Sequence, residues 1–500
     1  MTKEQALEKL RGYELKSFAL NHARGMVSVD GSTHAPKGSA EIRPITMGEI
    51  GKLSYELATC PETIEMLETL NSFKDDLPPL KAREVSELSK NLEKTKKVPK
   101  DLFIENRKIL AQSGTVWREA KAKNDFAMFE PYLQQVFDYK KKIYSCYNSG
   151  KTAYDACLEE CEKGWNTNVA DNFFSQIKAG LIPLIKAIKE QKAPVDNAPI
   201  KKYHSLDSQR KLSHFLTKQI CIDENFSAIA ETEHPYTSGF SKKDARINTH
   251  FHEYDIMSGV CSVLHEGGHA LYNLHSADEL MFTCLAGGAS SSMHESQSRF
   301  FENMVGRSKE FLTILLAKFK EMYPEDFTNV NSEDFYKMVN LSSPSLIRLD
   351  ADELTYCIHI VIRYELEKLM MSGDIKAKDL PQEWNRLYKE YLGLDVPTDR
   401  QGVLQDSHWS DGLIGYFPAY AIGSAYGPQF VREMNKDFDF SSAIADGNII
   451  KVNNWLEEKI WKYGKTLDSD VIYRNAAGGE LDPKCYIDYL SKKFKYIYNI

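Results

Sequence analysis

Residues 255–275 read DIMSGVCSVLHEGGHALYNLH, with apolar side chains three and four positions apart. That spacing is typical of an α-helix that buries one stripe of its surface. The residues of the stripe are Ile256, Val260, Leu264, Leu271 and Leu274. We therefore expect one helix over this stretch. Gly267 and Gly268 inside it each cost about 1 kcal/mol relative to alanine, a cost tolerated where backbone or ligand passes close, which favours a functional surface.

The same stretch places His265, Glu266 and His269 together. Residues four apart lie on one face of a helix, so both imidazoles can reach one metal ion. Glu266 lies about a quarter-turn round from His265, where it can contact a metal-bound water without ligating the metal. Two histidines with a carboxylate base are typical of a Zn²⁺ site that produces hydroxide near neutral pH and polarises a carbonyl.

A catalytic zinc site also needs a third protein ligand and one open position. The serine run after Gly287 and Gly288 predicts the cap of a second helix, which continues to Gly306. Glu295 falls in its first turn and is well placed to ligate a metal held by the preceding helix. Its neighbour His294 is the rival ligand, or else a hydrogen-bonded residue beside the site. We favour Glu295, because two histidines and a glutamate are a common peptidase zinc site.

Helical periodicity dominates the rest of the chain. Before residue 200 it covers seven stretches: 1–20, 48–72, 82–97, 103–122, 127–149, 151–164 and 171–190. Strand-like sequence is confined to residues 236–251, which predict one or two short strands. The proline-containing loop at 189–203 separates a helical part, 1–200, from a metal- and substrate-binding part, 201–500, within one domain. We expect a mainly α fold with a small sheet beside the metal helix.

Composition limits the partners and the compartment. A net charge of −8 without a long basic stripe argues against nucleic acid and anionic membranes. The longest apolar runs, such as residues 311–319, are too short to span a bilayer. The first residues lead into a charged amphipathic helix rather than an apolar signal core. Nine scattered cysteines, an odd number, are expected to be reduced thiols. We therefore expect a cytoplasmic protein.

The chain resembles the Taq-type thermostable metallocarboxypeptidases, and the trypanosomatid members most. The resemblance rests on four motifs in order: 265–269, HEGGH; 294–299, HESQSR; 347–356, IRLDADELTY; and 402–409, GVLQDSHW. A fifth, Asp-x-Arg-x-Thr, is matched only partly by residues 244–248. There Asn248 stands where threonine is expected, with Thr249 one place later. Arg246 of this motif is a candidate for contact with substrate.

The resemblance implies a reaction, and the residues suggest how substrate is held. A carboxypeptidase must fix a free α-carboxylate, and arginine does this best through two parallel charge-assisted bonds. Arg348 is our candidate for this contact. A salt bridge from Arg348 to Asp350 or Asp352 is the structural alternative. Asp352 is also a candidate for orienting a metal-ligating imidazole.

The last motif is expected to stabilise the oxyanion that forms during hydrolysis. His408 is a donor close to Tyr416 and Tyr420, which share a face if their run is helical. We expect His408 and Tyr420 to be catalytic and Tyr416 to contact substrate. Met304 lies nine residues after Glu295 and is a candidate for the pocket of the departing residue, or a core residue.

By resemblance, the fold is an elongated two-lobed helical body with a deep active-site groove, like the neurolysin and angiotensin-converting-enzyme group. The implied protein is a homodimer with one Zn²⁺, or Co²⁺, per subunit. It removes single C-terminal residues from peptides by a metal-activated water, with Glu266 as the base. The alternatives are an oligoendopeptidase or dipeptidyl carboxypeptidase, and, in another class, an inactive metal-stabilised helical binding protein. Glu266 argues against the last, because a structural metal site needs four ligands and no free base.

Overall fold

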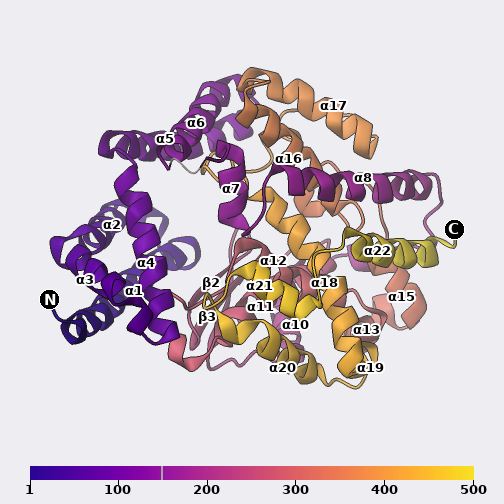
Figure 1. Cartoon of the computed structure of the whole chain (residues 1–500). Coiled ribbons are helices and arrows are strands. Elements are labelled where there is room, and N and C mark those ends of the chain that lie inside the picture. Colours follow the sequence, from indigo (N-terminus) through magenta and orange to yellow (C-terminus); the bar gives the residue numbers. More distant parts are fainter. Residues whose placement is uncertain (148–149) are drawn as a thin grey trace. The chain divides into compact units, whose positions relative to one another are not determined.

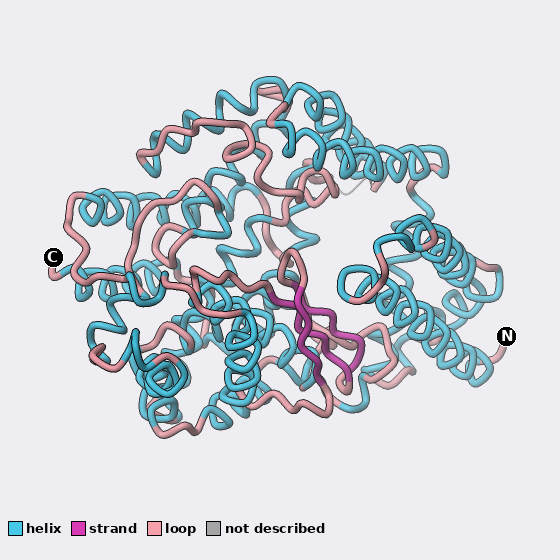
Figure 2. The backbone as a smooth tube through the Cα atoms, turned by 180° about the vertical axis from the view of Figure 1, so that it is seen from behind, coloured by secondary structure: helices cyan, strands magenta, loops and turns pink. Residues whose placement is uncertain are grey.

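The chain folds into α-helices and one three-stranded sheet (Figures 1 and 2). The computed structural model describes residues 1–147 and 150–500. The mainly α fold is confirmed. Two compact units are each assembled from separate stretches of the chain: Met1–Lys96, Lys201–Ala289 and Asp446–Ile472 in the first, and Lys97–Ile200, Ser290–Ala445 and Tyr473–Ile500 in the second. The chain passes from the second unit to the first after Ile200, inside the predicted loop at 189–203. Both units nevertheless contain residues from before and after this point.

The first unit combines the N-terminal helices, the sheet and the predicted metal helix. Its elements are α1 (Lys3–Thr33), η1 (Lys37–Glu41), α2 (Arg43–Thr59), α3 (Pro61–Ser72), η2 (Lys74–Asp76), α4 (Pro79–Lys97), α10 (Leu206–Gln219), β1 (Ser227–Glu231), β2 (Tyr236–Ser241), β3 (Asp244–Thr249), α11 (Ile256–Leu274), η3 (Asp278–Leu280), α20 (Ile449–Lys459) and η7 (Trp461–Tyr463). Two further helices lie at crossings between the units: α9 (Ala198–Lys201) and α21 (Ser469–Ala477).

The described residues of the second unit form helices joined by loops, with no strand among them. Its elements are α5 (Lys100–Lys123), α6 (Phe126–Cys146), α7 (Ala153–Cys161), α8 (Thr167–Lys189), α12 (Ser291–Arg299), the π-helical turn η4 (Phe300–Val305), α13 (Lys309–Met322), α14 (Pro324–Phe327), α15 (Ser332–Val339), η5 (Arg348–Asp350), α16 (Tyr356–Ser372), η6 (Ala377–Asp379), α17 (Leu380–Leu392), α18 (Phe417–Asp437), α19 (Phe440–Ala445) and α22 (Pro483–Tyr498).

Each of the seven helical stretches predicted before residue 200 overlaps a helix, with one correction. The stretch 48–72 is two helices, because Cys60 is extended at φ −66° and ψ 152° and Pro61 starts α3. Proline is suited to the first position of a helix, where its missing N–H has no intrahelical acceptor. The last two residues predicted for 127–149 lie outside the described residues, and α6 ends at Cys146.

The sheet has the order β1-β3-β2, with β1 parallel and β2 antiparallel to β3. The predicted strands within 236–251 are confirmed as β2 and β3. Strand β1 was not predicted, because its five residues are too few to show an alternating pattern. Strands β2 and β3 pack against α11, so the small sheet lies beside the metal helix as expected. A Cβ at Gly239 of β2 would come within 2.2 Å of the Asn273 side chain, so this close approach requires glycine.

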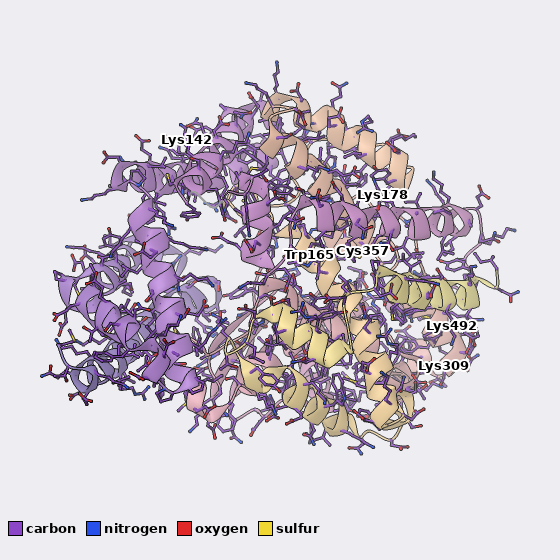
Figure 3. The ribbon with its side chains drawn as sticks, in the orientation of Figure 1. Lys142, Trp165, Lys178, Lys309, Cys357 and Lys492 are labelled. Atoms are coloured by element: carbon purple, nitrogen blue, oxygen red, sulfur yellow. The ribbon has the colours of Figure 1, made fainter. Side chains whose placement is uncertain are left out.

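In the second unit, α16 is buried along most of its length and contacts α8, α17 and α18. Figure 3 labels Cys357 on α16 and Lys178 on α8. The Cys357 thiol donates to the Tyr486 hydroxyl at 3.3 Å, and Lys178 pairs with Glu365 of α16. These contacts hold α16 in place, and α16 carries Tyr356 and Arg363, which contact candidate site residues described below.

No described helix has both the length and the apolar character that crossing a membrane demands. All nine cysteines are free thiols, as the sequence analysis predicted.

Candidate metal centre and substrate site

Helix α11 spans Ile256–Leu274, one residue short of the predicted stretch at each end. Its apolar stripe is buried, as predicted. His265 and His269 are half-buried, and their ring centroids lie 5.1 Å apart at an interplanar angle of 83°. The four-residue spacing therefore brings the two imidazoles together on one side of the helix.

Glu266 is held by the sheet. Its side chain is buried, with 4% of the residue exposed. The Thr237 hydroxyl of β2 lies 2.7 Å from Oε2 of Glu266 and 2.9 Å from its backbone oxygen. A hydroxyl at this distance restricts the rotation of the carboxylate. The strand thus orients the predicted base beside the two histidines that flank it in the sequence.

Gly267 has a packing role, which corrects the functional interpretation of this glycine. A Cβ at position 267 would lie 2.5 Å from Cδ1 of Ile220, directly after α10. Both Gly267 and Gly268 are buried. The missing side chain at 267 lets α10 and its following residues approach α11, so the close neighbour is the protein's own core rather than a ligand.

The partly matched motif at 244–248 forms strand β3. Arg246 is half-buried, and its Nη2 donates to Oδ2 of Asp244 at 2.9 Å. Asn248 is buried and donates to the backbone oxygen of Tyr236 in β2 at 3.1 Å. The Thr249 hydroxyl lies 2.8 Å from that of Ser262 on α11. Asn248 therefore fastens β2 to β3, and the role of Arg246 in substrate contact stays a prediction.

Glu295 lies on α12, whose N-terminus is capped by the Ser290 side chain, as predicted. It is the fifth residue of that helix, so it begins the second turn and not the first. The residue is 4% exposed, and the Ser298 hydroxyl donates to its Oε2 at 3.0 Å. A Cβ at Gly423 would come within 2.7 Å of the Glu295 backbone, so α18 packs directly against α12 at this residue. His294 is half-buried.

Three side chains among the described residues could together hold a metal ion: His265, His269 and Glu295. One candidate donor atom from each lies within 4.8 Å of the other two. Imidazole nitrogens and a carboxylate oxygen are ligands that Zn²⁺ accepts, at about 2.0–2.2 Å each. Ligands around one tetrahedral ion lie about 3–4 Å from one another at these bond lengths. Donors grouped within 4.8 Å are therefore close enough to converge on one ion.

Arg348 is buried in the second unit and pairs with Asp406. Its Nε and Nη2 donate to Oδ1 of Asp406 at 3.0 and 2.9 Å, and Nη1 donates to the Tyr356 hydroxyl at 3.0 Å. The alternative of a salt bridge to Asp350 or Asp352 is wrong, because the anionic partner is Asp406. The three bonds among described residues use three of the five N–H donors of the guanidinium. These bonds leave two of its N–H donors unused.

Asp406 is clamped by a second guanidinium. Arg363 of α16 donates from Nε to Oδ2 of Asp406 at 2.8 Å, and from Nη2 to Oε1 of Gln405 at 2.8 Å. Burial by itself would raise the pKa of Asp406, but the charges of Arg348 and Arg363 outweigh burial and hold that pKa well below its ordinary value. Asp406 is therefore a permanent anion that positions both arginines.

His408 lies beside this cluster, with Nε2 at 3.1 Å from the Tyr420 hydroxyl. Burial, and then the positive charge of Arg348, lower the pKa of His408 to about 3. The imidazole is therefore neutral at neutral pH. The rings of Tyr416 and Tyr420 are 5.3 Å apart at the start of α18, so the predicted shared face is confirmed. The Arg348 guanidinium lies 5.0 Å from the centroid of the Tyr420 ring.

Two further candidates have structural partners in the second unit. Asp352 accepts hydrogen bonds from the backbone N–H and the hydroxyl of Thr355 and from the Ser342 hydroxyl. Its carboxylate thus holds the start of α16, and these bonds give no support to its predicted role beside an imidazole. Met304 is 6% exposed, and its Cγ would lie 3.0 Å from a Cβ at Gly427. This packing on α18 favours the core interpretation.

Four residues that hold site groups were not predicted from the sequence: Thr237, Tyr356, Arg363 and Asp406. Arg363 was detectable, because a charged residue in the apolar run of 356–366 has to be paired if that run is buried. Asp406 lies within the quoted motif 402–409, but the sequence did not indicate its partners. Pairing it with Arg348 and Arg363 requires tertiary structure, since the three come from separate segments.

A family model described as "Carboxypeptidase Taq (M32) metallopeptidase" matches residues 9–494. "Carboxypeptidase 1" of Bacillus subtilis (strain 168) is 35% identical over 498 residues, which cover 98% of this chain and 99% of that protein. The M32 carboxypeptidase structure from Deinococcus radiodurans R1 has a TM-score of 0.96 at 30% identity and covers 99% of this chain and 100% of that one. Metallocarboxypeptidase 1 of Trypanosoma cruzi has a TM-score of 0.91 at 28% identity, with 98% and 99% covered.

The trypanosomatid likeness is therefore real, although its identity is lower than that of the Bacillus enzyme. The match covers nearly the whole chain, including every motif quoted from the sequence. The chain belongs to the Taq-type (M32) family of metallopeptidases and is a metal-dependent carboxypeptidase.

Proposed function

We propose that this carboxypeptidase cleaves the last peptide bond of its substrates at a divalent metal ion ligated by His265, His269 and Glu295. The observation that carries the proposal is the 4.8 Å grouping of their donor atoms. Such a set leaves the fourth tetrahedral position open. When bound, the metal polarises the scissile carbonyl and makes water a nucleophile near neutral pH. The nitrogen and oxygen donors support Zn²⁺, with Co²⁺ as the alternative and one ion per subunit.

Glu266 is proposed as the general base and acid. A carboxylate beside the ligand pair can accept the proton of the attacking water and deliver it to the leaving amine. The Thr237 hydroxyl on Oε2 supports this role, since it keeps the carboxylate in one orientation.

Arg348 is proposed to bind the α-carboxylate of the substrate. Its two remaining N–H donors match the two oxygens of a carboxylate, and the low exposure of the side chain makes such charge-assisted bonds strong. Asp406 fixes the plane of the guanidinium before substrate arrives. The neutral His408 and its partner Tyr420 are proposed to donate to the oxygen that becomes negative, with Tyr416 contacting substrate.

Metal retention separates the proposed roles of the two glutamates. Glu295→Ala removes a ligand, so the purified protein is expected to lose its metal. Glu266→Gln keeps every ligand, so it is expected to keep the metal and lose turnover. Elemental analysis together with hydrolysis of a free-acid peptide measures both quantities. Chelation should abolish wild-type activity, and added Zn²⁺ or Co²⁺ should restore it. Full metal occupancy in Glu295→Ala would transfer the ligand role to His294.

Family membership favours an exopeptidase over the oligoendopeptidase, dipeptidyl carboxypeptidase and inactive binding-protein alternatives. It also supports a homodimer, which light scattering of the purified protein tests directly. The nine free thiols support a reducing compartment, and we propose the cytoplasm.

A further inference from the structure

One carboxylate in the second unit bonds to both ends of a segment that separates two candidate site residues. Glu367 lies on α16 and is fully buried, with 0% of the residue exposed. Its Oε1 accepts from the Trp409 indole N–H at 2.8 Å, and its Oε2 accepts from the Gly415 backbone N–H at 2.9 Å. His408 directly precedes Trp409, and Tyr416 directly follows Gly415. One side chain therefore anchors the neighbours of both His408 and Tyr416.

The segment between these anchors, residues 409–415, is tightly folded. The Leu413 backbone N–H donates to the His408 backbone oxygen at 2.9 Å. Gly415 has a φ of +84°, a conformation that favours glycine, and a Cβ there would lie 2.7 Å from Cβ of Cys157 on α7. The segment thus has little slack, so displacement of either anchored end is expected to move the residue beside it.

The part of the candidate site around Arg348 is held by different contacts. Asp406, which bonds to Arg348, also accepts from Nε of Arg363 at 2.8 Å. Just before it in the chain, the Leu404 backbone oxygen accepts from the Trp117 indole N–H of α5 at 3.1 Å. These bonds do not involve the carboxylate of α16 that anchors 409–415. Its loss is therefore expected to disturb the two flanking residues and to leave the arginine clamp in place.

The surroundings of Glu367 make its charge sensitive to pH. The Tyr154 hydroxyl of α7 donates to Oε2 at 2.9 Å. Burial raises the pKa of Glu367 to about 7, and the bonds from Trp409, Gly415 and Tyr154, with the charge of Lys140 on α6, offset only part of that effect. The carboxylate is therefore ionised above neutral pH and takes up a proton below it.

Other titratable groups lie on the helices that pack against α16. Burial raises the pKa of the Cys157 and Cys161 thiols of α7, so both stay neutral near pH 7. The charged groups of α8 pair with other residues of α16: Asp171 with Lys368, and Lys178 with Glu365. A change of charge beside segment 409–415 near neutral pH therefore falls on Glu367.

We propose that Glu367 is a positioning residue of the reaction, whose ionised carboxylate keeps His408 and Tyr416 in their catalytic arrangement by fixing both ends of segment 409–415. This role rests on the function proposed for His408 and its partner Tyr420. A protonated carboxyl is a weaker acceptor and brings a fourth proton into a site that already holds three donors, so its bonds to the segment weaken. The ionised form therefore corresponds to the active arrangement.

The test compares kcat and KM of the wild type and Glu367→Gln, as full-length, metal-loaded proteins, on a free-acid peptide at a series of pH values. Glutamine keeps the shape of the side chain and removes one acceptor oxygen. Glu365→Gln is the matched control, because Glu365 lies on the same helix and its pair with Lys178 joins α16 to α8 rather than to segment 409–415. Metal content and the free energy of unfolding are measured for each protein.

We expect the wild-type kcat to exceed that of Glu367→Gln roughly tenfold at about pH 8.5 and to approach it at about pH 5.5, where the wild-type carboxyl is protonated. Titration of Glu266 is common to both proteins and cancels in this ratio. KM should change by less than about twofold, because the contact proposed for Arg348 is kept. Glu365→Gln should match the wild type throughout. A kcat ratio that does not vary with pH would reduce Glu367 to a structural anchor and overturn the proposal.

Tyr154→Phe tests the same carboxylate without removing it. Both bonds from Glu367 to segment 409–415 remain, but the pKa of Glu367 should rise further, because a hydrogen bond to its charged form is lost. The kcat of this variant relative to the wild type should be about one at about pH 9 and fall below one near pH 7. An unshifted profile would contradict the proposal even if Glu367→Gln does not fold.

His408→Gln separates failure of this inference from failure of the proposed function. An unchanged kcat in His408→Gln would overturn the proposed role of His408, and the positioning role of Glu367 with it. A large loss of kcat in His408→Gln, combined with a pH-independent ratio for Glu367→Gln, would overturn the positioning role alone.

Discussion

Asp406 in the second unit and Glu14 in the first are both carboxylates with little solvent contact. Their side chains are 12% and 1% exposed. Asp406 is bonded to two guanidinium groups, and its pKa is lowered, whereas the nearest ammonium to Glu14 lies 4.0 Å away and its pKa is raised to about 7. Burial alone therefore does not decide the charge of a carboxylate; the number and distance of the cations around it do.

The same contrast separates two uses of buried charge. Asp406 accepts hydrogen bonds from Arg348 and Arg363, and these bonds hold the Arg348 guanidinium that we propose to bind a substrate carboxylate. Glu14 has one oxygen that no described residue satisfies, and its carboxyl therefore retains a proton more readily than an ordinary glutamate does. We expect substitutions at the two positions to differ in size and in pH dependence.

The largest effect is expected from Asp406→Asn. Removing the anion leaves two buried guanidinium groups without their partner, which costs about 3–5 kcal/mol when a buried pair is broken. Denaturant unfolding of the variant measures this loss. Asp395→Asn is the control, because its pair with Lys389 is exposed and is worth less than about 1 kcal/mol. Equal losses in the two variants would remove the distinction between Asp406 and a surface carboxylate.

A smaller, pH-dependent effect is expected at Glu14. Its pKa is higher in the folded chain than the ordinary 4.5, so the folded state holds the proton more tightly. This contribution to stability is complete below about pH 4.5 and is lost as the pH rises to about 7, a change of about 3 kcal/mol. The free energy of unfolding should therefore fall across this range for the wild type relative to Glu14→Gln. Parallel curves for the two proteins would mean that Glu14 is compensated like Asp406.

The smallest change in pH dependence is expected from a substitution of His408, which should lower activity without moving the pH profile. Because its pKa is about 3, the imidazole stays neutral from pH 5 to 8. His408→Gln should lower kcat/KM by roughly a hundredfold, about 2.7 kcal/mol, through loss of a donor to the oxyanion. The acidic limb of the profile should keep its position. A shift of that limb in the variant would show that His408 titrates during catalysis and that Arg348 does not hold it neutral.

The sequence predicted what is local. The stretch 255–275 predicted α11 to within one residue at each end, since helical spacing alone sets which side chains share a face. The serine cap and the position of α12 could also be predicted, since a cap depends on residues next to the helix start. The partners of Arg348 could not be predicted, because Tyr356 and Asp406 come from segments whose proximity depends on how α16 and α18 pack. The interpretation of Gly267 failed similarly: Ile220, which it accommodates, is distant in sequence.

Amidation of a substrate's C-terminus, combined with Arg348→Ala, tests the central claim most directly. Amidation should lower wild-type kcat/KM on the order of a hundredfold or more, equivalent to about 2–4 kcal/mol of transition-state stabilisation, because a charge-assisted contact is lost. Arg348→Ala should lower cleavage of the free acid by a similar factor and barely change cleavage of the amide, since both changes remove one interaction. Equal losses on both peptides would reduce Arg348 to a structural partner of Asp406. Efficient internal cleavage of the amidated peptide would contradict the proposed recognition of the free C-terminus.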